Sequence, residues 1–466
     1  MPARAKASRK ARPKAPRAPS AARRAERESA GRALRRDVPR AAHGQWKRAG
    51  DGRDPVGILE ASNKGRLANL IPIRYGRMVK SPFTFMRGSA AVMAHDLAHT
   101  PVTGLTAQLC GDCHVLNFGL FATPERHLVF DLNDFDETLP GPWEWDVKRL
   151  AASVVVAGRD NGFTDSQCRD AVMACMRSYR EGVRACARMS PLEVWYLHLD
   201  WQDVIDRETD IRAKRIEEKV AEAARKRVIE HLFPRIVKAS GGGFRFVDQP
   251  PLLHHAPDLK IEQRVARAMA AYRHTLPADR RVLFDRYEVR DFALKVVGIG
   301  SVGTRCAVVL LMSRDDDVLI LQVKEARASV LEPYAKRCRY ENQGERVVAG
   351  QRLMQSSSDI FLGWVGDVDG RDYYIRQLRD MKFSAPLEQA TARQLDQYVK
   401  LCGWSLARAH AKSGDAAAIG GYLGKGERFD EALVRFAVAY ADQTERDHAA
   451  LVKAVRSGRV EMLSEQ

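Results

Sequence analysis

The segment 110–119, CGDCHVLNFG, contains residue types that can act in phosphoryl transfer. Asp112 and Asn117 lie on either side of a histidine in this segment. A carboxylate close to an acceptor hydroxyl can serve as a general base, and an Asn oxygen can hold Mg²⁺ on the phosphates of a nucleotide. We therefore take Asp112 as the candidate catalytic base and Asn117 as a candidate catalytic and metal-binding residue.

A second group of oxygen ligands follows in the sequence LNDFDE. Asp134 is the main candidate metal ligand there and Asp136 lies close by, while Asp131 competes with Asp134 from one strand position back. Carboxylate oxygens suit Mg²⁺. Acids this close repel one another unless a cation lies among them. The sequence therefore predicts a magnesium site made by Asn117, Asp134 and Asp136.

The same segment 110–119 also matches a haem-attachment pattern, formed by Cys110, Cys113 and His114. That interpretation leaves Asp112 and the acidic turn unexplained, and it requires an exported chain. No apolar signal-peptide core is visible at the N-terminus, and the eight cysteines are too scattered for a disulfide framework. We expect a reducing, cytoplasmic location, and a redox-sensitive Cys110–Cys113 pair stays open.

A glycine-rich stretch, Gly298-Ile-Gly300-Ser301-Val-Gly303, matches the pattern G-x-G-x-x-G. A dinucleotide site needs a helix directly after these glycines. Here the β-branched sequence TRCAVVLLM follows, which is typical of a strand. A glycine turn between two strands is the hairpin that covers the phosphates in kinases, so Gly298, Gly300, Ser301 and Gly303 are candidate nucleotide-binding residues. A plain β-hairpin is the alternative.

Lys324 lies near the end of the next predicted strand, LILQVKEA. A cation at this place can reach the α- and β-phosphates beneath the hairpin, and an acid must hold it there. We predict Glu345, on the following helix, as that partner, with Glu341 in reserve. Lys324 is thus a candidate catalytic and nucleotide-binding residue, although a charge on an edge strand would also explain it.

The N-terminal segment 1–54 has 17 Lys and Arg against 5 Asp and Glu, in a chain of net charge +17. It is rich in Ala, Pro, Arg and Lys and offers almost nothing apolar to bury, which predicts a disordered basic tail. Such a tail can bind nucleic acid or another polyanion, or it can be merely solvated. No apolar run approaches the ~20 residues of a membrane span.

The pattern of apolar and β-branched residues divides the remaining chain into three regions. Residues 55–280 are mainly helical and carry the loops with Asp112 and Asp134. Residues 281–383 are rich in strands, and residues 384–466 are helical again. The sequence predicts an α+β fold with two lobes, in which the last region completes the helical lobe and 281–383 binds the nucleotide.

Several long motifs carry a family resemblance: RYGRMVKSPFTFMRG, LCGDCHVLNFG, FDLNDFDETLPGPWEWDVKRLAAS, VVGIGSVGTRCAVVLL, LQVKEA and AYADQTERDH. From about residue 57 onward the chain resembles the bacterial domain-of-unknown-function family 2252. That family resembles the protein-kinase-like clan, nearest to the aminoglycoside and choline phosphotransferases. The resemblance implies Asp112 as the catalytic Asp, His114 as a loop-shaping residue, Asn117 and Asp134 as Mg²⁺ ligands, and Asp146 in a structural role.

The order of the motifs departs from the kinase pattern, because the glycine loop and Lys324 come after Asp112. Either the fold is circularly permuted, or one of the two halves is a false match. For the permuted kinase-like fold we expect Lys324 within about 10 Å of the Asp134 carboxylate across a cleft, since one phosphate chain must span both. The end of the helix near 395–409 should then lie beside the Asp112 loop. A second candidate loop, HAKSGD, ends at Asp415 but lacks the Asn and the acidic strand.

These expectations favour an ATP- and Mg²⁺-dependent phosphotransferase acting on a small-molecule or protein hydroxyl. Arg87 of the motif FMRG either contacts a phosphate or forms an ion pair beneath its helix. One alternative is a metal-dependent phosphate-ester hydrolase that uses the same acids as a two-metal site. Another is a non-catalytic protein that binds nucleotides or polyanions.

Overall fold

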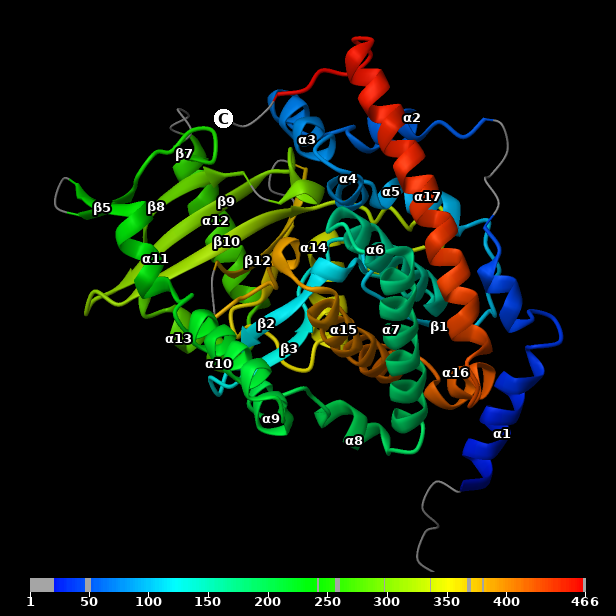
Figure 1. The fold of residues 1–466 in the computed structure, drawn as a ribbon. Helices are drawn as coiled ribbons and strands as arrows, with labels where there is room; N and C mark the ends of the chain where they lie inside the picture. Colours follow the sequence, from blue (N-terminus) through cyan, green and yellow to red (C-terminus); the bar gives the residue numbers. More distant parts are fainter. Residues whose placement is uncertain are drawn as a thin grey trace, which may run out of the picture.

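The computed structural model describes residues 21–46, 52–240, 243–255, 260–296, 298–335, 337–366, 370–378 and 381–463. Figure 1 shows an antiparallel sheet on one side of the molecule and a helical body on the other. The predicted α+β class is thereby confirmed. No helix among the described residues is long and apolar enough to cross a membrane.

The main sheet has six strands in the order β11-β12-β10-β9-β8-β7, and every neighbouring pair is antiparallel. Its strands are β7 (Leu253–His254), β8 (Tyr287–Lys295), β9 (Cys306–Ser313), β10 (Val318–Ala326), β11 (Gly363–Val365) and β12 (Asp372–Gln377). The glycine-rich stretch connects β8 to β9, so the predicted strand–glycine–strand order is confirmed. Helix α14 (Gln343–Met354) follows β10 and packs against β11 and β12.

Both faces of the sheet are covered by segments from before residue 287. On one face Leu311 of β9 packs with Tyr272 of α12 (Lys260–Thr275), and α13 (Ala278–Phe284) adds Phe284. On the other face Leu310 packs with residues of α11 (Ile229–Ile236) and of the β5–β6 hairpin (Val237–Ser240 and Gly243–Phe246). Successive strand residues point to opposite faces, so each face needs its own cover. The elements that cover the sheet therefore start near residue 229, before the predicted boundary at 280.

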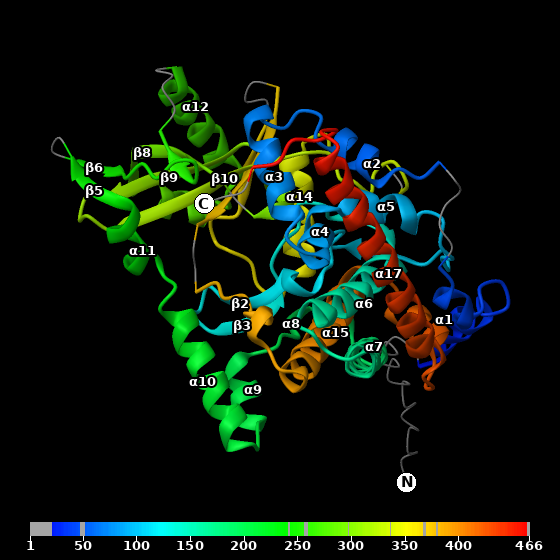
Figure 2. The same cartoon turned by 45° about the horizontal axis from the view of Figure 1, so that its top comes forward.

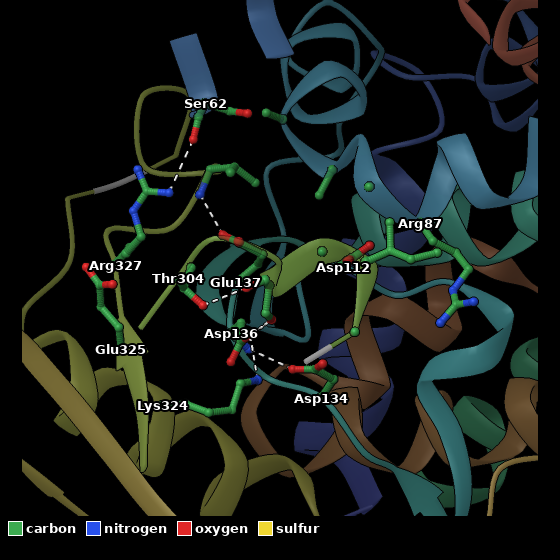
Figure 3. A pocket seen from close by; sticks show the side chains of 18 of the residues that line it. Ser62, Arg87, Asp112, Asp134, Asp136, Glu137, Thr304, Lys324, Glu325 and Arg327 are labelled. Atoms are coloured by element: carbon green, nitrogen blue, oxygen red, sulfur yellow. Dashed lines mark hydrogen bonds and ion pairs between the residues drawn. The ribbon is translucent and has the colours of Figure 1, made fainter. Parts of the chain in front are cut away.

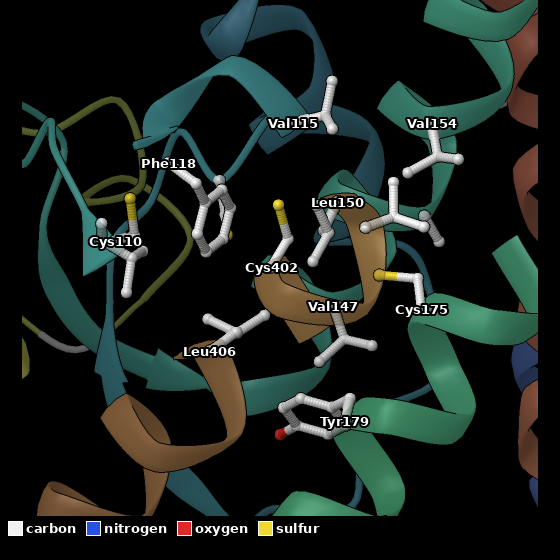
Figure 4. Packing of buried hydrophobic residues seen from close by; sticks show 14 of the residues in the cluster. Cys110, Val115, Phe118, Val147, Leu150, Val154, Cys175, Tyr179, Cys402 and Leu406 are labelled. Carbon is white, nitrogen blue, oxygen red and sulfur yellow. The ribbon is translucent and has the colours of Figure 1, made fainter. Parts of the chain in front are cut away.

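The helical body centres on four long helices: α6 (Trp143–Asp160), α7 (Asp165–Cys186), α15 (Ala392–Ser413) and α17 (Arg428–Arg456). Figure 4 shows the core between α6, α7 and α15, where Val147, Leu150, Cys175 and Leu406 meet. Gly403 lets α15 approach α7 closely, because a Cβ atom there would lie 2.3 Å from the Cys175 carbonyl oxygen. This packing holds the helices in place, and these helices support the loops that lie between the helical body and the sheet.

Shorter elements complete the structure. They are α2 (Pro55–Ser62), α3 (Ile71–Met78), α4 (Pro82–Gly88), α5 (Ala90–Leu97), β1 (Thr106–Leu109), β2 (Phe118–Ala122), β3 (Leu128–Leu132) and β4 (Leu139–Pro142). Figure 2 shows α3, α4, β2 and β3 between the sheet and the long helices. The outer helices are α8 (Pro191–Tyr196), α9 (Trp201–Arg207), α10 (Ile211–Arg225) and α16 (Ala416–Leu423). Strand β1 pairs with β4 and β2 pairs with β3, which positions the loops that carry the acids.

The N-terminal segment is folded where the structure describes it. Helix α1 (Ala21–Ala33) packs against α16, as Figure 1 shows. A Cβ atom on Gly421 would lie 2.1 Å from the Glu28 carbonyl oxygen, so the two helices are in backbone contact. Arg35 donates hydrogen bonds to the carbonyl oxygens of Gly421 and Tyr422. The predicted disorder is therefore wrong for residues 21–46 and 52–54, while residues 1–20 and 47–51 lie outside the described part.

His43 should make the docking of this segment sensitive to acid. Its ring is fully buried, hydrogen-bonded to the Tyr422 hydroxyl at 2.7 Å and packed against Phe429. Burial, together with the nearby charge of Lys148, lowers the pKa of His43 to about 3. Between that value and the ordinary value near 6.5, the unfolded chain binds a proton that the folded chain does not, so stability falls as pH falls through this window.

The expected result is a melting temperature that drops more steeply between pH 6.5 and about pH 4 in the wild type than in His43→Gln. His127→Gln removes an exposed ring and should keep the wild-type slope. Equal slopes in wild type and His43→Gln would show that His43 does not control acid stability.

Candidate functional site

A cavity of about 610 Å³ lies between the sheet and the helical body. Its lining includes, from the helical body, Asp112, Asn117, Asp134 and Asp136, and, from the sheet side, Gly298, Gly300, Ser301 and Lys324. Figure 3 shows Asp134 and Asp136 close to Lys324, with Asp112 farther from it. Two segments far apart in the sequence thus share one cavity. Gly303 and Glu345, which were also predicted at the site, do not line it.

The loop that carries Asp112 is held by Asp146 at the start of α6. The backbone amides of Cys110 and Gly111 donate to the two Asp146 carboxylate oxygens at 2.7 and 2.9 Å. Gly111 has a φ of +87°, and a Cβ atom there would lie 2.2 Å from the Glu137 carbonyl oxygen. Only glycine fits such a turn without strain. Asp146 therefore has the structural role that the family resemblance implies.

Asp112 presents one carboxylate oxygen to the protein and the other to the cavity. Arg149 donates to Oδ1 from Nε at 2.6 Å and also ion-pairs with this oxygen through Nη2. Oδ2 lies beneath the glycine loop, where a Cβ atom built on Gly300 would be 3.9 Å away. Burial raises the pKa of Asp112, and the charge of Arg149 opposes that rise. A carboxylate with a raised pKa is a stronger proton acceptor, as a general base requires.

Asn117 and Asp134 have oxygens that fit a magnesium ion. The Asn117 amide nitrogen donates to the Asp112 carbonyl oxygen, which leaves Oδ1 of Asn117 free of that bond. Asp134 lines the cavity, and among the contacts of the described chain its carboxylate accepts only a 3.3 Å bond from the Asp136 amide. Within the described ranges no three His, Cys, Asp or Glu side chains are grouped to hold a metal. Mg²⁺ commonly uses one or two carboxylates together with substrate phosphates, so this sparse donor set fits it.

Lys324 pairs with Asp136, so the predicted pairing with Glu345 or Glu341 is wrong. The Lys324 ammonium donates to Asp136 Oδ2 at 2.8 Å, and both side chains are largely buried. Glu345 instead lies in the first turn of α14, where its amide is capped by Asn342. The neighbouring Arg346 is the residue that α14 turns toward the site, and it donates to the carbonyl oxygens of Asp136 and Thr138. At the site, α14 therefore presents the guanidinium of Arg346 and not the carboxylate of Glu345.

Asp136 also accepts hydrogen bonds from the Tyr374 hydroxyl at 2.6 Å and from Ser301 Oγ at 2.8 Å. Burial alone would raise its pKa, but Lys324 and these two hydroxyls hold the pKa of Asp136 well below its usual range. Its carboxylate is therefore ionised and fully engaged with protein donors. Asp136, one of the predicted metal ligands, already has the Lys324 ammonium as its cationic partner.

Two other candidate acids lie away from the cavity. Asp131 is buried and accepts two 2.7 Å hydrogen bonds from Arg408 of α15, as well as one from the Ser356 amide. Asp415, of the second candidate loop, caps the N-terminus of α16 and pairs with Arg27. Both carboxylates thus have structural partners, and Asp134 is the acid of its group that faces the cavity without one.

The glycine loop is bonded to the segment after α2, a contact that no sequence motif indicates. Arg66 donates to the carbonyl oxygens of Val302 and Gly300 at 2.6 and 3.0 Å, and the Leu67 amide donates to that of Gly303 at 2.8 Å. Gly303 has a φ of +85°, which only glycine adopts readily. Gly303 therefore shapes the loop without lining the cavity. No sequence motif marks Arg66, because its partners are backbone oxygens of residues more than 200 positions away in the chain.

The cysteines of the haem-like pattern belong to the core. Cys110 and Cys113 are fully buried in the main hydrophobic cluster, and burial raises the pKa of Cys113 well above its usual value. A buried, protonated thiol is unreactive. All eight cysteines are free thiols. The structure therefore disfavours both haem attachment and a redox-active pair at this segment.

One comparison with known proteins found a match. The family model described as "Uncharacterized protein conserved in bacteria (DUF2252)" matches residues 66–454, which is most of the chain. The search of curated proteins found no match, and the search of solved structures found none either.

Proposed function

The chain belongs to the bacterial family DUF2252, and we propose that it is a kinase-like phosphotransferase that uses ATP and Mg²⁺. The observation that carries the proposal is the single cavity lined by Asp112, Asn117 and Asp134 on one side and by the glycine loop and Lys324 on the other. Phosphoryl transfer depends almost entirely on positioning and charge stabilisation, and these are the parts that it needs.

The β-rich lobe supports this proposal by its order of elements. A glycine loop joins the first two long strands, the lysine lies on the third, and a helix follows, as in protein kinases. The parts that would come next in a kinase come earlier in this chain, which is why we propose a circular permutation. The end of α15 lies beside β1, where Ser413 Oγ accepts from the Gln108 amide at 2.8 Å and His410 lies 3.3 Å from Asp146. A helix from the end of the chain thus packs behind the Asp112 loop.

The proposed step is an in-line displacement. The acceptor hydroxyl gives its proton to Asp112 Oδ2, its oxygen bonds to the γ-phosphorus of ATP, and the bond from that phosphorus to the bridging oxygen breaks to release ADP. Asn117 and Asp134 would hold Mg²⁺, which when bound neutralises charge on the phosphates. Lys324 would bind the phosphates from the sheet side, and the glycine loop would cover them.

The two-metal hydrolase alternative is less well supported by the same geometry. A two-metal site needs several carboxylates around a pair of ions. Asp136 is engaged by Lys324, and Asp131 by Arg408, which leaves Asp134 as the carboxylate of that group free of a cation. A hydrolase would also give no role to Lys324 or to the glycine loop.

The test is to incubate the purified protein with Mg²⁺ and either γ-labelled or α-labelled ATP, together with candidate acceptors. The proposal expects the γ label to move to an acceptor and ADP to appear, with loss of both in Lys324→Met. Movement of the α label would instead identify adenylyl transfer. Release of labelled phosphate that persists in Lys324→Met would support the hydrolase, and ATP binding without any product would support a non-catalytic protein.

A further inference from the structure

A partly buried arginine, whose guanidinium has no bonded partner among the described residues, lies beside the proposed catalytic base. Arg87, in the last turn of α4, lines the cavity, and no hydrogen bond or ion pair reaches it from the described part of the chain. Its Nε atom is buried and unpartnered. Burial lowers the pKa of Arg87, while the charges of Asp112 and Glu388 oppose this effect. A partly buried cation without a bonded partner is incompletely compensated, so the site favours an anion.

Two further features point to the same place. His114 is 4% exposed, lines the cavity, and has a buried Nδ1 with no hydrogen-bond partner. Burial holds the pKa of His114 well below its usual value, and Arg87 and Arg149 lower it further, so the ring is neutral and offers an N–H on one nitrogen. Helix α5 starts two residues after Gly88 without a side-chain cap, and its first residues, Ala90 and Ala91, line the cavity. A helix N-terminus attracts negative charge.

The position of Arg87 separates this group from the nucleotide phosphates. In Figure 3 Arg87 lies beyond Asp112 when viewed from Lys324. The base must touch the acceptor hydroxyl, whereas Lys324 and the glycine loop serve the donor, so a group beyond the base lies on the acceptor side. The other arginines on this wall are used differently: Arg66 and Arg327 bond to backbone carbonyl oxygens, and Arg74 bonds to Asn63 and to the Gly88 carbonyl.

We propose that Arg87, His114 and the N-terminus of α5 bind an acidic group of the phosphoryl acceptor, so that the acceptor is a small hydroxyl compound carrying a phosphate or a carboxylate. This inference rests on the proposed function. The acid group would anchor the acceptor while its hydroxyl gives a proton to Asp112 Oδ2 and forms the new bond to phosphorus, with ADP leaving. Arg87 would then determine which acceptors are used.

The test uses the full chain saturated with Mg²⁺ and ADP, so that the donor site is filled. Inorganic phosphate and glycerate are then titrated separately in a calorimeter, which distinguishes phosphate from carboxylate recognition. Binding of at least one of them should weaken about tenfold or more in Arg87→Gln, the effect of losing a charge-assisted hydrogen bond. Lys80→Gln, which removes an exposed cation just before α4, should bind like the wild type.

Acceptor use gives the second readout. Glycerol 3-phosphate, glycerate and glycerol share a three-carbon skeleton and differ in the acid group. Glycerol 3-phosphate or glycerate should therefore accept the γ label better than glycerol does. This preference should be present in the wild type and absent from Arg87→Gln. Equal binding of both anions by wild type and Arg87→Gln, or preferred transfer to glycerol or choline, would overturn the inference. If ADP itself does not bind, the proposed function fails first. If ADP binds and neither anion does, only this inference fails.

Discussion

Asp112→Asn is expected to lower turnover by ~10²–10⁴, the range for a lost general base, while the affinity for Mg²⁺ and ATP stays nearly unchanged. Asparagine keeps an oxygen for the hydrogen bond from Arg149, so the loop should keep its shape, but it cannot accept the proton of the acceptor. Turnover of γ label and the dissociation constant for ATP, measured on the same preparation, separate the chemical step from binding.

Asp415→Asn is the matched control, because Asp415 belongs to the rival loop and caps α16 away from the cavity. It should retain wild-type turnover. The pH profile adds a signature: Asp112 must be unprotonated to act, and burial raises its pKa, so wild-type turnover should fall on the acid side at a pH above the ordinary range for an Asp. This limb should be missing from the residual activity of Asp112→Asn. If ATP binding collapses with turnover, Asp112 is a metal ligand or a structural residue instead.

Loss of Arg53 is expected to cost about 3–5 kcal/mol of stability, the usual result of breaking a buried ion pair from one side. Arg53 donates to both carboxylate oxygens of Asp96 at 2.6 Å and to those of Asp447 at 2.6 and 2.7 Å. All three side chains are at most 5% exposed. Arg53→Ala would leave two buried carboxylates without their cation, and denaturant unfolding measures the loss.

A truncation series extends this prediction to the N-terminal segment. Removing residues 1–20 should leave the melting temperature close to that of the full chain, whereas removing 1–54 should lower it sharply, because α1, the His43 contact and Arg53 are then lost. Arg459→Ala, which breaks only exposed pairs with Asp54 and Glu60, should change little. A chain starting at residue 55 that melts like the wild type would show that the segment is dispensable.

Local patterns predicted several of the residues that line the cavity. Asp112, Asn117 and Asp134 lie on short loops next to short strands, where the residue types themselves define the chemistry, and Lys324 lies on a strand with clear β-branched periodicity. The cavity that joins them was expected because one phosphate chain must reach both halves. These expectations depended on residue types and on the distances that the chemistry requires, both of which the sequence contains.

Other features depend on packing between distant segments. The choice of Asp136 rather than Glu345 as the partner of Lys324 depends on which side of α14 faces the site, and there it is Arg346 that bonds to the Asp136 carbonyl oxygen. The folding of residues 21–46 depends on close contacts between small residues such as Gly31 and Ala418, which hydropathy does not register. The motif FMRG leaves two equal roles for Arg87, a phosphate contact and an ion pair, and the absence of any bonded partner among the described residues favours the first.

The most direct measurement of the central claim is the Mg²⁺ dependence of ATP affinity, by calorimetry, in the wild type, in Asp134→Asn and in Glu345→Gln. Asp134 is the proposed metal ligand, whereas Glu345 lies off the cavity and serves as the control. The account predicts that Mg²⁺ tightens ATP binding in the wild type and in Glu345→Gln and makes no difference in Asp134→Asn. Mg²⁺-linked ATP binding that survives unchanged in Asp134→Asn, or a wild type that does not bind ATP at all, would contradict it.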